Sequence, residues 1–153
     1  MMTLIFCYGS NLDDAQMLVR CPGRAKVGNA VLRGHRLTFP RISPRRGCGV
    51  SSVEPAEGHE VWGVVHRLDE ADLASLDGFE GFEPGGPSDL NRYVRMTVVV
   101  EIDGVATDVE TYIAVPTADP PAPNAGYLGQ IRDGARLHGL PEAYQAWLAG
   151  LKF

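Results

Sequence analysis

The sequence predicts an α+β fold: a small, mixed and mostly antiparallel β-barrel with flanking α-helices. Its apolar residues occur in short runs bounded by turn-forming residues, a pattern typical of strands. The 18 glycines and 11 prolines are too many for a helical bundle and suit short strands joined by tight turns. The expected elements do not alternate strictly between strand and helix, which argues against a doubly wound parallel sheet. With 153 residues, the chain is expected to form a single domain over residues 1–153.

The first half of the chain is expected to contain most of the strands. Residues 4–8 are a short apolar run, which predicts a buried strand that stops at Gly9. Residues 13–19 have helical spacing, with Ser10 or Asn11 as the N-cap. Further strands are predicted at 27–39, with bends at Gly28 and Gly34, at 49–53 and at 60–68, and a loop is predicted over 40–49.

The second half is expected to contain a hairpin between helices. Asp69 is expected to cap a helix that ends at Gly78. Residues 93–102 and 105–115 predict two strands, and Asp103-Gly104 between them is a typical two-residue hairpin turn. A proline-rich loop is expected over 116–124, then a helix over 127–138 and a helix from Pro141 with Tyr144, Trp147, Leu148 and Leu151 on one face.

Charge and composition exclude several classes of function. The net charge of −5 makes nucleic acid and anionic membranes poor partners. No apolar stretch approaches the ~20 residues of a membrane-spanning helix, and no signal-peptide pattern is present, so a cytoplasmic location is expected. Cys7, Cys21 and Cys48 include no C-x-x-C pair, which argues against a disulfide framework and a zinc site. Nucleotide-binding and metal-binding motifs are also missing, so neither a cofactor nor a metal is expected.

The segment Tyr8-Gly9-Ser10-Asn11 is a candidate binding loop between a buried strand and a helix. Glycine lets a ligand approach the backbone closely, and the free N–H groups at the start of a helix attract anions. Such a loop could hold a carboxylate or a developing oxyanion. An ordinary capped turn between a strand and a helix would have the same residues.

Glu80 is the second candidate, just past the predicted helix and between Phe79 and Phe82. Partial desolvation by these rings would raise the pKa of the carboxyl group, which suits a residue that takes and returns a proton. A solvated loop glutamate is the alternative, and the nearby Glu83 shows that the position is not unique.

A small basic cluster comprises Arg41, Arg45 and Arg46. It is interpreted as part of a solvated loop rather than as an anion contact.

Six segments in this order resemble the γ-glutamylcyclotransferase family. They are FCYGSNL at 6–12, EVWGVVHRL at 60–68, LDGFEG at 76–81, RYVRMTVVV at 92–100, TYIA at 111–114, and the segment 120–148 with its GLP turn. YGSN alone is moderately specific. The succession YGSN, LDxxEG and GLPxxY is a strong signature, and the resemblance covers nearly the whole chain.

The resemblance implies a fold and a reaction. The family's small β-barrel with flanking helices agrees with the fold expected above. The reaction is a cyclising cleavage of γ-glutamyl amides, in which the substrate's own α-amine attacks its γ-carbonyl and releases 5-oxoproline and a free amine. Glu80 would act as the catalytic acid and base, with no metal or cofactor. The implied substrate-binding residues are Tyr8, Gly9, Ser10, Asn11, Leu12, Tyr93, Tyr112 and Tyr127.

Other functions stay open at this stage. One is a barrel that only binds an amino-acid-like ligand, and another is a cyclotransferase specific for γ-glutamylamines. A hydrolase with Cys7 as its nucleophile is disfavoured, because Cys7 lies in a predicted buried strand. The segment 81–92 is longer than expected for animal-type members, so the leaving group of the substrate stays open. The expected partner is a small γ-glutamyl substrate rather than nucleic acid or membrane, and a homodimer is left open.

Overall fold

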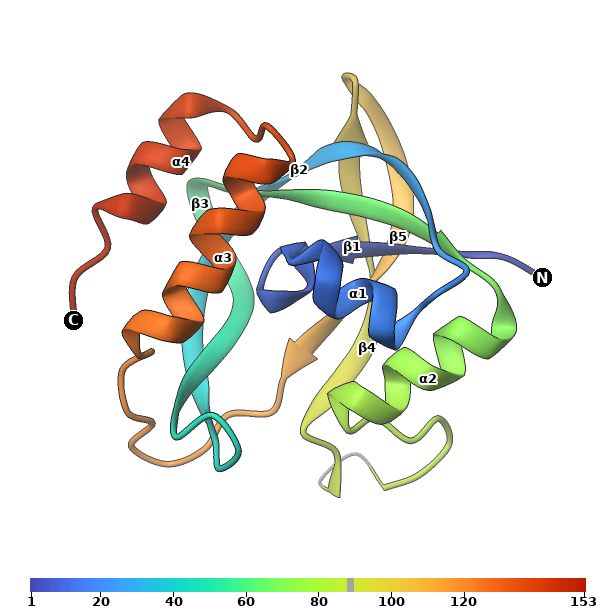
Figure 1. Cartoon of the computed structure of the whole chain (residues 1–153), viewed down its shortest axis with the longest axis horizontal. Coiled ribbons are helices and arrows are strands. Elements are labelled where there is room, and N and C mark those ends of the chain that lie inside the picture. The colour runs from blue at the N-terminus through green and yellow to red at the C-terminus, as the bar shows by residue number, and fades with distance from the viewer. Residues whose placement is uncertain (88–89) are drawn as a thin grey trace.

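The computed structural model describes residues 1–87 and 90–153. Over these residues, strands and helices follow one another in a mixed order along the chain (Figure 1). The elements are β1 (Thr3–Cys7), the 3₁₀ turn η1 (Ser10–Leu12), α1 (Asp14–Arg20), β2 (Ala25–Ser43), β3 (Cys48–Leu68), α2 (Glu70–Glu80), β4 (Tyr93–Ile102), β5 (Val105–Ala114), α3 (Ala125–Leu137) and α4 (Glu142–Ala149).

The strands form a closed barrel in the order β1-β3-β2-β4-β5. Neighbouring strands are antiparallel, as in the β1–β3 pair, where Phe6 lies opposite Val65. The exception closes the barrel: β1 runs parallel to β5, with Ile5 opposite Glu110. The helices lie outside the barrel, with α3 and α4 on one side and α1 and α2 on another (Figure 1). The predicted fold class, a mixed and mostly antiparallel barrel with flanking helices, is therefore confirmed.

β2 and β3 form one long antiparallel hairpin, which the sequence analysis divided into shorter pieces. The predicted loop over 40–49 is wrong at both ends, because β2 continues to Ser43 and β3 begins at Cys48. A register shift between Thr38 and Arg41 accommodates the intervening proline, which cannot donate a ladder hydrogen bond. The predicted strands at 49–53 and 60–68 are likewise parts of the single strand β3. The register also shifts at the predicted bends, Gly28 and Gly34.

Two helix boundaries differ from prediction for local reasons. The N-cap of α1 is Asp13 rather than Ser10 or Asn11, because the 3₁₀ turn η1 precedes the helix. Asp69 caps α2 as predicted, since its Oδ1 accepts the N–H of Asp72 at 2.8 Å. The helix does not end at Gly78 but continues to Glu80, and Gly81 ends it in the left-handed conformation with φ of 69°.

The C-terminal half follows the predicted order closely. Asp103 and Gly104 have φ of 50° and 78°, as a primed two-residue turn requires, and they join β4 to β5. The two predicted C-terminal helices are present as α3 and α4. Only part of the expected face of α4 is buried: Tyr144 and Leu148 lie in the core, whereas Trp147 is 43% exposed.

The 3₁₀ turn η1 packs directly against α3, and this contact positions the chain before it. Leu12 is fully buried in the core. A Cβ atom placed on Gly134 would lie 2.7 Å from the carbonyl carbon of Leu12, so α3 can approach the backbone of η1 only because residue 134 is glycine.

We expect Gly134→Ala to lower the free energy of unfolding by about 1–3 kcal/mol, because the added methyl group must displace a backbone segment. Gly129→Ala is the control in the same helix, since its Cβ would meet no atom within 4 Å. The control should be neutral or stabilising, because alanine favours helix. Urea denaturation of the two variants checks the difference, and equal stabilities would contradict the packing described here.

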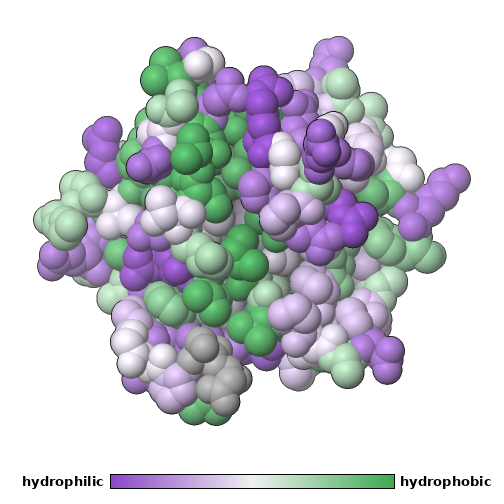
Figure 2. All heavy atoms as spheres, turned by 180° about the vertical axis from the view of Figure 1, so that it is seen from behind, coloured by the Kyte–Doolittle hydropathy of each residue, from purple (hydrophilic) through white to green (hydrophobic). Residues whose placement is uncertain are grey.

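Among residues 1–87 and 90–153, none of the helices has both the length and the apolar character needed to span a membrane. On the face shown in Figure 2, hydrophobic side chains occur in small groups separated by hydrophilic ones.

Candidate active site

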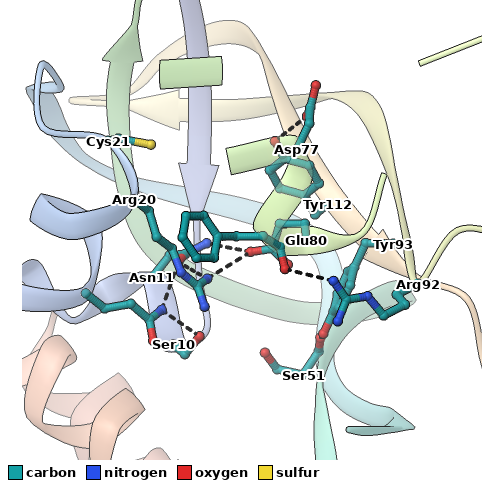
Figure 3. A network of polar contacts seen from close by, with 12 residues as sticks. Ser10, Asn11, Arg20, Cys21, Ser51, Asp77, Glu80, Arg92, Tyr93 and Tyr112 are labelled. Carbon is teal, nitrogen blue, oxygen red and sulfur yellow. Dashed lines mark hydrogen bonds and ion pairs between the residues drawn. The ribbon is translucent and has the colours of Figure 1, made fainter. Parts of the chain in front are cut away.

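The candidate site lies where η1, the end of α1 and the end of α2 meet (Figure 3). Glu80 is the last residue of α2, and its side chain is only 13% exposed. Gly81, which follows it, ends the helix in the left-handed conformation. The Glu80 carboxylate therefore lies at the end of the helix and not in a solvated loop. The prediction that Glu80 is desolvated is therefore confirmed, although the residue belongs to the helix.

Asn11 and Arg20 hold the Glu80 carboxylate. The amide Nδ2 of Asn11 donates to Glu80 Oε1 at 2.8 Å, and Arg20 Nη1 lies 3.5 Å from the same oxygen. The orientation of the amide is set from its other side. Asn11 Oδ1 accepts hydrogen bonds from Arg20 Nη1 at 3.0 Å and from Gln16 Nε2 at 2.9 Å, so Nδ2 is left to face Glu80.

Burial and neighbouring charge act on Glu80 in opposite directions. Burial raises the pKa of its carboxyl group, and this is the larger effect. The Arg20 guanidinium and the hydrogen bond from Asn11 stabilise the ionised form and so lower the pKa, though by less. A carboxyl group with a raised pKa that is still held by a cation can both accept and return a proton.

The four tyrosines predicted for the site line one small buried space. This inner pocket is lined by Phe6, Cys7, Tyr8, Gly9, Ser10, Asn11, Ser51, Glu80, Tyr93, Tyr112 and Tyr127. Burial raises the pKa of all four phenols, so their hydroxyls stay protonated. The pocket therefore brings neutral hydroxyl groups and one carboxylate together.

The tyrosine hydroxyls bond to groups of the barrel and of α2 other than the Glu80 carboxylate. Tyr93 donates to the carbonyl oxygen of Ser51 at 2.7 Å, and the hydroxyl of Tyr127 lies 2.7 Å from Ser51 Oγ. Tyr8 donates to the carbonyl oxygen of Tyr112 at 2.5 Å. The hydroxyl of Tyr112 itself donates to Asp77. These bonds fix the rings as walls of the pocket.

Asp77 anchors α2 to the barrel, a role that the sequence analysis did not assign. Its carboxylate accepts the Tyr112 hydroxyl at 2.6 Å and two nitrogens of Arg95, at 3.0 and 3.2 Å. Asp77 lies one helical turn before Glu80, so this bidentate pair fixes the turn that carries the candidate catalytic carboxylate. Arg95 on β4 had no local signal, since its partner is 18 residues away in sequence.

Two predicted loop residues have structural roles. Gly9 is close to protein atoms rather than to open space, because a Cβ there would lie 2.2 Å from Ser51 Oγ. Leu12 does not line the inner pocket; its side chain is fully buried in the core and its N–H donates to the carbonyl oxygen of Gly9. In the structure Leu12 anchors the loop, and its part in substrate binding stays a prediction.

A second, larger space of about 520 Å³ adjoins the inner pocket. This outer cavity shares Ser10, Glu80, Tyr93 and Tyr127 with the inner pocket. Its wall also includes Arg20, Arg92 and the cluster Arg41, Arg45 and Arg46. The interpretation of that cluster as a solvated loop is wrong for Arg41 and Arg46, which are partly buried in the cavity wall, while Arg45 is exposed.

The segment after Glu80 also borders the outer cavity, since Arg92 at its end lines the wall. Glu83 within this segment is exposed. Two residues of the long 81–92 segment, Ser88 and Asp89, lie outside the described residues.

Within residues 1–87 and 90–153, the arrangement of side chains favours neither a metal site nor a cysteine nucleophile. In the part of the chain that the structure describes, no group of three or more His, Cys, Asp or Glu side chains could hold a metal ion. Cys7 lines the inner pocket, but burial strongly raises the pKa of its thiol. A neutral, buried thiol is a poor nucleophile, which argues against the hydrolase alternative.

Comparisons with known proteins agree with this geometry. A family model described as "Gamma-glutamyl cyclotransferase, AIG2-like" matches residues 5–130. Two proteins named "Gamma-glutamylcyclotransferase", from Mus musculus and Homo sapiens, are each 30% identical to this chain, covering 97% of it and 78% of the relative. A solved structure named "Gamma-glutamyl cyclotransferase" has a TM-score of 0.88 and 30% identity, covering 99% of this chain and 89% of that one.

Proposed function

The chain belongs to the gamma-glutamyl cyclotransferase, AIG2-like family, and from this premise we propose that it cleaves γ-glutamyl amides by cyclisation with Glu80 as the general acid and base. The named relatives and the family model indicate an enzyme of the γ-glutamylcyclotransferase type. What this chain adds is a specific arrangement of groups that can carry such a reaction.

The reaction removes two protons from the α-nitrogen and needs no co-reactant. Glu80 takes the first proton from the substrate's α-ammonium and releases it to water, and the free amine attacks the γ-carbonyl carbon. A bond forms between the α-nitrogen and that carbon, and Glu80 takes the second proton from the attacking nitrogen. Glu80 gives this proton to the leaving nitrogen as the bond from the carbon to that nitrogen breaks, so that the products are 5-oxoproline and an amine, which takes up a proton from water to become an ammonium ion. An α-ammonium with a pKa of about 8 requires a base whose own pKa is raised.

The observation that carries the proposal is the position of Glu80 between the two spaces. Its carboxylate lines both the inner pocket and the outer cavity. A γ-glutamyl group in the inner pocket would place its amide bond beside Glu80 and its leaving group in the outer cavity. One carboxylate would then reach both the α-nitrogen and the leaving nitrogen, as the proton transfer requires.

The first residues of η1 offer N–H donors for the developing negative charge on the γ-carbonyl oxygen. The first bond within this turn runs from the N–H of Leu12 to the carbonyl oxygen of Gly9, at 3.0 Å. The preceding N–H groups, at Ser10 and Asn11, have no partner within the turn, as at the start of any helix. Donors placed at the edge of a buried pocket stabilise an oxyanion without reorganisation.

Incubation with a panel of γ-glutamyl amino acids and γ-glutamylamines tests the proposal. The expected product is 5-oxoproline, released in equal amount with the free amine. Release of glutamate in place of 5-oxoproline would show hydrolysis by water and contradict the cyclisation. Binding without either product would favour the barrel that only binds a ligand.

We expect Arg20→Gln to move the acid limb of the pH dependence of kcat/KM to higher pH. Activity rises as Glu80 ionises, and the Arg20 guanidinium lowers the pKa of that carboxyl group. Removing the cation therefore raises the pKa of Glu80 and delays its ionisation. Arg36→Gln is the control, because Arg36 pairs with Glu54 at an exposed position. An unchanged acid limb in Arg20→Gln would mean that another group controls it.

A further inference from the structure

The outer cavity is lined by many more positive than negative side chains. Its charged residues are Arg20, Arg41, Arg45, Arg46, Arg92 and the single acid Glu80. The chain as a whole carries a net charge of −5, so this concentration of arginines runs against the overall composition. A concave, single-sign surface attracts ligands of the opposite charge.

Three of these arginines come from the β2–β3 hairpin, and we call Arg41, Arg45 and Arg46 the hairpin arginines. Arg41 donates to the carbonyl oxygen of Val115 at 2.9 Å. Arg46 donates to the side-chain oxygens of Gln130 and Gln16, at 3.0 Å each. Its guanidinium also lies 5.0 Å from the centre of the Tyr127 ring. Neutral acceptors thus orient two of the three side chains and leave their charge uncompensated.

No acid of the protein neutralises the hairpin arginines within residues 1–87 and 90–153. The arginines that form ion pairs in that part are Arg20, Arg33, Arg36, Arg95 and Arg136. Arg20 is occupied by Glu80, so the free charge of the cavity comes from the hairpin arginines and from Arg92, which donates to the carbonyl oxygen of Phe79. Guanidinium groups match carboxylates and phosphates through paired N–H donors.

We propose that the amine released by this enzyme carries two or more negative charges, as carboxylates or a phosphate group, which the hairpin arginines bind in the outer cavity. The proposal rests on the function proposed above, because it takes the γ-glutamyl group to occupy the inner pocket. The leaving nitrogen would then sit beside Glu80, with the rest of the leaving group among the hairpin arginines. The proposal therefore concerns the leaving group of the substrate, which the sequence alone leaves open.

Paired substrates that differ in one anionic group test the inference. For carboxylates, γ-glutamylglutamate is compared with γ-glutamylglutamine, which has the same shape and one carboxylate fewer. For phosphate, γ-glutamyl-phosphoethanolamine is compared with γ-glutamyl-ethanolamine. In at least one pair, the more acidic substrate is expected to have a kcat/KM about 10-fold higher, the size of one charge-assisted hydrogen bond. The pair that shows the preference identifies the anion.

Arg45→Gln and Arg41→Gln should each lower kcat/KM more for the more acidic substrate than for its partner, and so reduce this preference toward equality. Arg45 is exposed, so its replacement should leave thermal stability unchanged. Arg136→Gln is the control, because Arg136 lies on α3, pairs with Asp133 and does not line the outer cavity. In the wild-type protein, added salt should lower kcat/KM more for the acidic substrate than for its partner.

The outcomes separate the two proposals. Equal kcat/KM values within both pairs, with 5-oxoproline formed from each substrate, would overturn the charged leaving group and leave the cyclotransferase function standing. A preference that survives in both arginine variants would also overturn it. Failure of every γ-glutamyl compound to give 5-oxoproline would overturn the cyclotransferase function itself, and the inference with it.

Discussion

Replacing Glu80 by glutamine is expected to lower kcat by about 10²–10⁴-fold, the usual cost of losing a general acid–base group. The amide keeps the shape of the side chain and can still accept the hydrogen bond from Asn11 Nδ2. It cannot take a proton from the α-ammonium or return one to the leaving nitrogen. The measurement is the rate of 5-oxoproline formation at saturating substrate, with thermal denaturation to show that the fold is intact.

Glu83→Gln separates the catalytic role from a general effect of removing a carboxylate. Glu83 lies three residues later and is exposed, whereas the Glu80 side chain is 13% exposed and held by Arg20. We expect Glu83→Gln to change turnover by only a few-fold, of the order seen for exposed charges. An inactive Glu83→Gln together with an active Glu80→Gln would show that the wrong glutamate has been assigned.

The parts of the fold that the sequence predicts correctly are set by local interactions. Asp69 caps α2 because its side chain reaches an N–H three residues away. The Asp103-Gly104 turn forms because both residues tolerate positive φ. In contrast, Gly78 does not end α2, since a glycine inside a helix only weakens it and the signal that ends the helix is the left-handed Gly81.

The long hairpin could not be predicted for a different reason. Pro40 suggests a break in the local pattern, yet β2 and β3 pair on both sides of it, with the register shifted between Thr38 and Arg41. Such pairing depends on the partner strand, which a local pattern does not reveal.

The candidate site likewise contains residues that the sequence identifies and residues that only the folded chain brings together. Tyr8, Asn11 and Glu80 stand out as sequence motifs, and the structure brings them to one pocket. The bonds that hold the walls of the pocket and the end of α2 join distant positions. Ser51 bonds Tyr127 across 76 residues, and Arg95 bonds Asp77 across 18. These partners are ordinary residues in their own segments, and only the folded barrel shows what they touch.

Acetylation of the substrate's α-amine is expected to abolish turnover, because it removes the nucleophile while leaving the scissile amide unchanged. An N-acetyl nitrogen has its lone pair delocalised into the new amide, so it neither accepts a proton at neutral pH nor attacks a carbonyl. Glu80 then has no ammonium to deprotonate, whatever its pKa. The intramolecular pathway, which needs only folding of the substrate into a near-attack conformer, is closed.

The measurement is release of the free amine from an N-acetylated γ-glutamyl amide, with the unacetylated parent as the positive control. The acetylated compound should also inhibit turnover of the parent competitively, which shows that it reaches the pocket and that its inertness is chemical. Steady release of the amine together with N-acetylglutamate would show that water attacks the carbonyl carbon. The carboxylate of Glu80 would then act on a water molecule, and the protein would be a hydrolase built on the same barrel.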